Sequence, residues 1–169
     1  YVGLVSGACL SDVGNTVHCV DRDENKVSAL QSGKVPIYEP GLHDIVCRNV
    51  KEGRLFFTTN LKNALREAEV CFIAVDTPLG EDGQADISNV LNVAKNIAEL
   101  IDHSLTVVVK STVPVGTTKQ VKNFIGSTYV EVAFNPEFLK EGDAVGDFMK
   151  PDRVVVGTES DEVAAKLHA

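Results

Sequence analysis

The start of the chain and the end of its first predicted strand carry residues whose types and spacing suit a dinucleotide. Tyr1-Val2-Gly3 precedes an apolar helical pattern that contains Gly7, as expected for the end of a Gly-x-Gly-x-x-Gly turn. The free N–H groups at the start of such a helix can bind a pyrophosphate. Small residues that open a helix can equally serve close packing, so this pattern alone leaves both interpretations open.

Asp21 is the second feature of this kind. It follows the strand predicted over 16–20 and stands 18 residues beyond Gly3, near the spacing at which a carboxylate binds the adenosine ribose hydroxyls. A 2′-phosphate about 4 Å away would cost on the order of 4 kcal/mol in charge repulsion, which favours NAD over NADP. Arg22 or Lys26 could instead contact a phosphate, and Asp21 could simply cap the following helix.

Two glutamates and a threonine follow later strands. Glu137 and Glu141 are four residues apart, and on a solvated helix such a like-charge pair would be slightly unfavourable. A functional role would explain the pair, and a short solvated helix is the alternative. Thr112 follows a buried apolar run, where a Ser-Thr pair can serve either as a cap or as a site residue.

These residues need strands and helices to position them, and the chain alternates the two patterns. Strands are predicted over 16–20, 55–58, 70–75, 105–109, 129–134 and 153–156. Helices are predicted at the start of the chain and over 24–31, 42–50 and 117–124. Three further helices are predicted to begin after the cap residues Asn60, Asp86 and Ser160. This alternation predicts an α/β fold with a doubly wound parallel sheet, in which ligands bind beyond the carboxyl ends of the strands.

Length and composition limit the alternatives. The chain has 169 residues and a formal charge of −8, enough for one domain with a real core and unfavourable for non-specific binding to nucleic acid or a membrane surface. No apolar run reaches the roughly 20 residues that span a bilayer. The four cysteines are widely spaced among apolar neighbours, which predicts buried free thiols, no metal site, and a reduced, cytoplasmic setting.

Six segments together resemble the NAD-binding domain of the UDP-glucose/GDP-mannose dehydrogenase family over essentially the whole chain. They are Tyr1–Gly7, Ile37–Leu42, Gly53–Leu55, Val75–Pro78, Lys110–Thr117 and Asn135–Gly142. The last two are the most specific. Glu39 and His43, in and behind the second segment, are expected to be structural.

The resemblance implies roles for particular residues. Glu137 would be the proton donor and acceptor, and Thr112 would help position water. The NAD-binding residues would be Tyr1, Val2 and Gly3 at the pyrophosphate, Asp21 and Lys26 at the ribose, and Val75, Asp76, Thr77, Ser111, Thr112, Val113 and Glu141. The nucleotide-sugar would be lined by Glu137, Phe138, Leu139, Lys140 and Glu141. Members more often carry Gly or Asn in place of Asp76, whose side chain is therefore expected to point away from the pyrophosphate.

The resemblance also implies a reaction. Members oxidise a sugar C6 alcohol to an acid with two NAD⁺ per turnover, through a thioester on a cysteine that none of the four cysteines here matches. UDP-glucose is the favoured substrate; GDP-mannose, UDP-N-acetylmannosamine and a non-catalytic NAD-binding module are the alternatives. We expect residues 1–169 to be an NAD-binding domain without its first strand, unstable and inactive alone. In the full-length protein a central helix and second domain would follow, with assembly as a homodimer or larger homo-oligomer.

Overall fold

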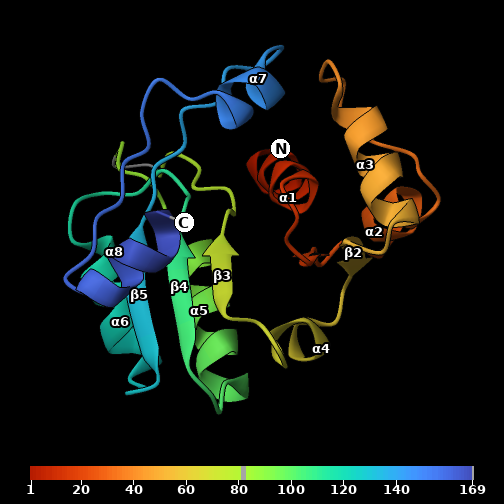
Figure 1. Cartoon of the computed structure of the whole chain (residues 1–169). Coiled ribbons are helices and arrows are strands. Elements are labelled where there is room, and N and C mark those ends of the chain that lie inside the picture. The colour runs from red at the N-terminus through yellow and green to blue at the C-terminus, as the bar shows by residue number, and fades with distance from the viewer. Residues whose placement is uncertain (81–82, 169) are drawn as a thin grey trace. The chain divides into compact units, whose positions relative to one another are not determined.

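A computed structural model describes residues 1–80 and 83–168 of the chain (Figure 1). Helices and short strands alternate along it, as predicted. In chain order the elements are α1 Val2–Asp12, β1 Val17–Val20, α2 Glu24–Gln31, α3 Leu42–Lys51, β2 Leu55–Thr58, α4 Leu61–Leu65, β3 Val70–Ile73, α5 Ser88–Leu100, β4 Leu105–Val109, α6 Thr117–Ile125, β5 Val130–Phe134, α7 Ala144–Met149 and α8 Asp161–His168.

The described strands form two separate parallel sheets. One contains β1 and β2, with Val17 opposite Leu55. The other has the order β3-β4-β5, with Val109 of β4 opposite Phe134 of β5. The predicted α/β class with parallel strands is confirmed.

The chain divides into two compact units, each of which contains one sheet. Unit 1 is Tyr1–Ala64 with Phe138–Arg153, and unit 2 is Leu65–Glu137 with Val154–Ala169.

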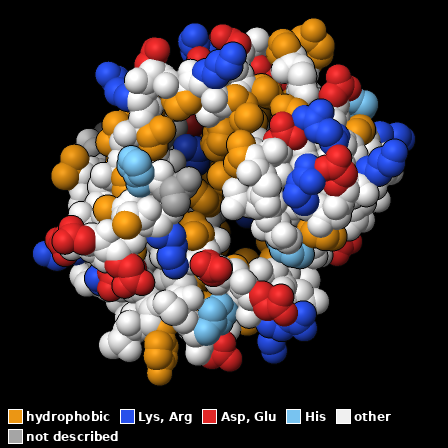
Figure 2. Space-filling model, in the orientation of Figure 1, with side chains coloured by type: hydrophobic (Ala, Val, Ile, Leu, Met, Phe, Trp, Pro, Cys, Tyr) orange, Lys and Arg blue, Asp and Glu red, His pale blue; other side chains and the backbone are white. Residues whose placement is uncertain are grey.

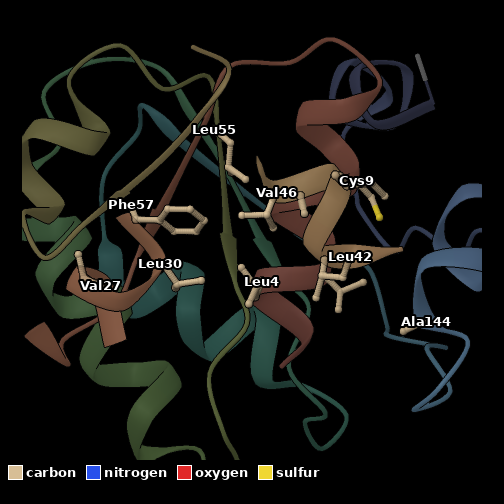
Figure 3. Close-up of a cluster of buried hydrophobic side chains, with 12 residues drawn as sticks. Leu4, Cys9, Val27, Leu30, Leu42, Val46, Leu55, Phe57 and Ala144 are labelled. Atoms are coloured by element: carbon tan, nitrogen blue, oxygen red, sulfur yellow. The ribbon is translucent and has the colours of Figure 1, made fainter. Parts of the chain in front are cut away.

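The core of unit 1 joins the first three helices to the two-stranded sheet (Figure 3). Val5, Ala8 and Cys9 of α1 are fully buried, and Leu42 and Val46 of α3 are buried with them. Each buried Val or Leu side chain contributes about 1.5–3 kcal/mol relative to exposure. The remaining buried members are Leu4, Val27, Leu30, Ile45, Leu55, Phe57 and Ala144. A two-stranded sheet is marginal alone in water, so these helices stabilise it.

Unit 2 is built around β4. All five residues of Leu105–Val109 are buried, which confirms the buried strand predicted over 105–109. On one side, Val163 of α8 packs with Val108 and Ala133. Helices α5 and α6 contribute Val90, Ala94, Ile97 and Val121, all fully buried.

The predicted caps are largely confirmed. The backbone N–H of Asn63 donates to the Asn60 side chain at 3.0 Å, and that of Val163 donates to Ser160 Oγ at 3.3 Å. Gly33 follows α2 with a φ of +79°, which an L side chain rarely adopts. Asp86 accepts the N–H of Ser88 at 2.8 Å, but the cap position before α5 belongs to Ile87.

One predicted strand is wrong. Residues 153–156 form no strand, and only a single antiparallel bridge joins Gly157 to Phe134. The reason is that the carbonyl of Val155 accepts a hydrogen bond from the Asn135 side chain at 2.9 Å in place of a ladder partner. The short helix α7 was not predicted.

The surface mixes acidic and basic side chains over the face seen in Figure 2. Within the described residues, no helix is long and apolar enough to cross a membrane.

Candidate cofactor and substrate site

The N-terminus of α1 has the features of an anion site. Tyr1 is its N-cap residue and makes no side-chain cap bond, and the first turn contains no acidic residue. The opening N–H groups are therefore left without a side-chain acceptor, and the helix dipole adds a partial positive charge there. This arrangement fits the pyrophosphate role predicted for Tyr1, Val2 and Gly3.

Gly7 fixes how closely α1 approaches the sheet. A Cβ at this position would collide with Cys19 Sγ of β1 and would lie 3.6 Å from a methyl carbon of Val17. Because glycine leaves that space free, α1 packs directly against the strand that leads to Asp21. The packing role predicted for the small residues is therefore present at Gly7, and the pyrophosphate role of the helix start stays a prediction.

Asp21 is not the cap of α2. That position belongs to Asp23, whose carboxylate accepts the N–H groups of Asn25 and Lys26. Asp21 instead accepts the N–H of Asp23 at 3.1 Å and pairs with Lys26 Nζ at 2.5 Å. Burial opposes ionisation of Asp21, but the Lys26 and Asp23 hydrogen bonds outweigh it and lower its pKa. An ionised carboxylate is what ribose recognition requires, and Lys26 already partly neutralises it.

The carboxyl ends of β3, β4 and β5 are joined by hydrogen bonds within unit 2. The backbone N–H of Val75 donates to Ser111 Oγ at 2.9 Å, and Ser111 Oγ donates to the Val75 carbonyl at 2.7 Å. Thr77 Oγ1 donates to the carbonyl of Thr112 at 2.7 Å. The predicted cofactor residues after β3 and after β4 therefore form one connected edge. Asp76 and Thr112 are exposed on it and Val113 is half-buried.

Lys110 extends this network to β5, and the sequence analysis gave it no role. It is only 6% exposed, and its Nζ donates to Asn135 Oδ1 at 3.0 Å. Burial lowers the pKa of Lys110, and the charge of Glu137 opposes that shift. The sequence signal for Lys110 was a lysine placed directly after a buried, mostly apolar strand, because such a position is buried unless the chain turns outward.

Thr112 and Glu137 leave the sheet at the same edge. Thr112 stands three residues after the last residue of β4, and Glu137 three residues after that of β5, and those last residues are paired in register. Glu137 is half-buried. Residues 135–140 are not helical, so the alternative of a solvated helix carrying Glu137 and Glu141 is wrong.

The remaining residues predicted to line the sugar lie in unit 1. Leu139 packs against the core of that unit, whereas Phe138, Lys140 and Glu141 are exposed. Arg153 lies over the Phe138 ring, 5.3 Å from its centroid. The predicted site residues are thus divided: Thr112, Glu137, Val75–Thr77, Ser111 and Val113 belong to unit 2, and Tyr1–Gly3, Asp21, Lys26 and Phe138–Glu141 to unit 1.

The four cysteines are free, with Cys9 buried and the others partly buried. Burial raises the pKa of Cys9 to about 11, with a smaller contribution from Asp12. Burial also raises the pKa of Cys71 to about 11 and that of Cys19 to about 12. These three thiols stay protonated at neutral pH and are poor nucleophiles.

Known proteins share this sequence and fold. The UDP-glucose 6-dehydrogenase from Pseudomonas aeruginosa is 48% identical to this chain over its full length. The UDP-glucose 6-dehydrogenase from Rhizobium meliloti is 50% identical over 98% of this chain. The chain covers 40% and 39% of those two relatives.

Solved structures agree. A UDP-glucose dehydrogenase from Pyrobaculum islandicum matches with a TM-score of 0.94 and 38% identity, over 99% of this chain and 40% of that one. A GDP-mannose dehydrogenase from Pseudomonas aeruginosa matches with a TM-score of 0.93 and 34% identity, over 99% of this chain and 41% of that one. A family profile matches residues 1–169 in full. The chain therefore belongs to the UDP-glucose/GDP-mannose dehydrogenase family and corresponds to its NAD-binding domain.

Proposed function

We propose that the protein containing this chain oxidises the C6 alcohol of UDP-glucose to the acid, yielding UDP-glucuronate, with this chain supplying NAD binding and the base. The observation that carries the proposal is the paired end of β4 and β5: Thr112 and Glu137 each follow that end by three residues, and a Lys110–Asn135 hydrogen bond joins the two exits. The names of the relatives at 48% and 50% identity support UDP-glucose as the sugar nucleotide.

The residues of unit 1 suit one end of the cofactor. The uncapped start of α1 offers N–H donors to the pyrophosphate, and the Asp21 carboxylate accepts the adenosine ribose hydroxyls. NAD⁺ held by these residues would supply the acceptor for a hydride from the sugar carbon. Over the whole reaction, two NAD⁺ and one water would convert the alcohol to the acid, with release of two NADH and two protons.

The residues of unit 2 suit the reacting end. Glu137 takes a proton as water adds, and the Thr112 hydroxyl orients that water. Lys110 places a positive charge near Glu137. A covalent thioester would require a cysteine other than Cys9, Cys19 or Cys71, because burial keeps these thiols protonated.

The test is steady-state turnover of the protein encoded by the complete reading frame. We expect two NADH per UDP-glucose, and faster turnover with UDP-glucose than with GDP-mannose or UDP-N-acetylmannosamine. Glu137→Gln should lower kcat by about 100-fold or more, the usual scale for a lost acid–base group. Its NAD affinity should stay within about twofold, because the groups that hold the adenosine end are elsewhere.

Glu99→Gln, on the exposed face of α5, is the matched control and should turn over normally. Undiminished kcat in Glu137→Gln would remove this residue from its role. NAD binding without oxidation of any of the three sugar nucleotides would favour the non-catalytic module.

A further inference from the structure

Glu39 is a buried carboxylate that joins distant parts of unit 1. It is only 5% exposed although it lies in a turn outside any helix or strand. Its Oε2 accepts the Tyr1 hydroxyl at 2.7 Å and the backbone N–H of Gly142 at 3.0 Å, and its Oε1 accepts the N–H of Ala144 at 2.8 Å. The two N–H donors come from more than 100 positions further along the chain.

These bonds keep the carboxylate ionised. The Tyr1 hydroxyl lowers the pKa of Glu39 most; burial opposes that effect, and the amides of Gly142 and Ala144 reinforce it against the charge of Asp147. Hydrogen bonds to an ionised acceptor are about twice as strong as neutral ones. Removing the acceptor would leave the buried N–H of Ala144 without a partner.

The segment that Glu39 holds, residues 138–144, lies outside any strand and enters a helix only at Ala144, the first residue of α7. Residues 135–140 form neither helix nor strand, and Phe138, Lys140 and Glu141 are exposed. Within unit 1 the segment is held by Leu139 in the core, by Asp147, which accepts the N–H of Lys140 at 2.8 Å, and by Glu39 just after Glu141. The Glu39 bonds fix the end of the segment next to its last predicted sugar-contacting residue.

We propose that Glu39 is a positioning residue that holds the substrate segment 138–144 in its binding conformation and ties it to Tyr1 at the start of α1. The sugar-binding part of this claim rests on the proposed function. The tie itself does not, because it is a property of the carboxylate and its three donors. Glu39 thereby acquires a role beyond stabilising its own turn.

Trypsin cleavage after Lys140 reports the tie directly, because an exposed lysine is cut at the rate at which its segment opens. Glu39→Gln cannot accept from all three donors, so cleavage should accelerate about tenfold or more. Tyr1→Phe removes one donor and leaves both backbone bonds, so its acceleration should stay below about twofold. Glu24→Gln, an exposed carboxylate on α2, should behave as the wild type.

Kinetics of the protein from the complete reading frame separate positioning from general stability. In Glu39→Gln, KM for UDP-glucose should rise about tenfold or more, while KM for NAD⁺ and kcat change by less than about threefold. Changes of equal size in KM for UDP-glucose, KM for NAD⁺ and kcat would indicate a structural role only and would overturn the proposal. Turnover of UDP-glucose by the wild-type protein tests the proposed function separately. If the wild type shows no turnover while Glu39→Gln still accelerates trypsin cleavage, the positioning of the segment by Glu39 stands and its role in sugar binding fails.

A measurement on the wild-type protein covers the case in which Glu39→Gln does not fold. The amide of Gly142 belongs to an exposed residue outside any helix or strand, so its protection from hydrogen exchange must come from Glu39. We expect exchange at least about 100-fold slower than for an unprotected amide. Unprotected exchange at Gly142 and Ala144 would overturn the proposal.

Discussion

Replacing Gly7 by alanine tests the close packing of α1 on β1. A Cβ here collides with Cys19 Sγ, so the sulfur or the helix must move. Overpacking of this kind costs about 1–3 kcal/mol. Alanine in a helix interior gains up to about 1 kcal/mol over glycine, which offsets part of that cost. We expect Gly7→Ala to lower the free energy of unfolding by about 1–2 kcal/mol.

The sign should reverse when the sulfur is removed. In a Cys19→Ala background the new methyl group no longer meets Sγ, and its other neighbour, the Val17 methyl at 3.6 Å, is at ordinary contact distance. Gly7→Ala should then raise the free energy of unfolding by about 0.5–1 kcal/mol through helix propensity alone. The coupling between the two substitutions should therefore be about 1.5–3 kcal/mol.

Urea unfolding followed by circular dichroism measures the four proteins of this double-mutant cycle: the wild type, Gly7→Ala, Cys19→Ala and the double variant. The four variants are compared in the protein from the complete reading frame, with the far-ultraviolet helix signal as the probe. Equal destabilisation by Gly7→Ala in both backgrounds would refute the packing argument, because the cost would then lie in the backbone rather than against Cys19. NAD affinity should follow stability, since the start of α1 moves with the helix.

Two further predictions concern carboxylates of unit 1. Asp21→Ser should narrow the preference for NAD over NADP by about tenfold or more in calorimetric titrations, because it removes the charge that repels a 2′-phosphate. An unchanged ratio would exclude Asp21 from the ribose. Hydrogen bonds from Arg48 and then Asn49 lower the pKa of Asp12, against a smaller effect of burial. The stability that ionised Asp12 gives the folded protein is therefore fully present above pH 3.8. It is lost as the pH falls through the lower pKa that Asp12 has in the folded state. Asp12→Asn should accordingly differ from the wild type in urea midpoint at pH 6 and converge with it towards pH 2; a constant difference would contradict this.

Local signals predicted most of the fold correctly. Leu105–Val109, with four apolar residues and one threonine, is a central strand because such a β-branched, mostly apolar run suits a buried environment. Asn60 and Ser160 begin their helices because their side chains accept N–H groups three residues ahead. Residues 153–156 also have strand character, yet they form none, because a distant side chain, that of Asn135, takes the Val155 carbonyl.

The predicted site residues came from strand ends, from the start of the first helix and from the family resemblance. Asp21, Thr112 and Glu137 were singled out because they follow strands. The polar partners that hold such residues were not found. Glu39 depends on amides more than 100 residues away, and Lys110 on an asparagine at the end of the next strand. No window of local sequence contains both members of either pair.

The buried thiols make each unit report its own opening. Cys9 and Cys19 lie in unit 1 and Cys71 in unit 2, and burial suppresses the thiolate in all three. A brief pulse of alkylating reagent should therefore modify these thiols slowly in the closed state, and faster during excursions that expose them. Mass spectra of the digested protein would then show which of the two units opens more often, without any engineered label.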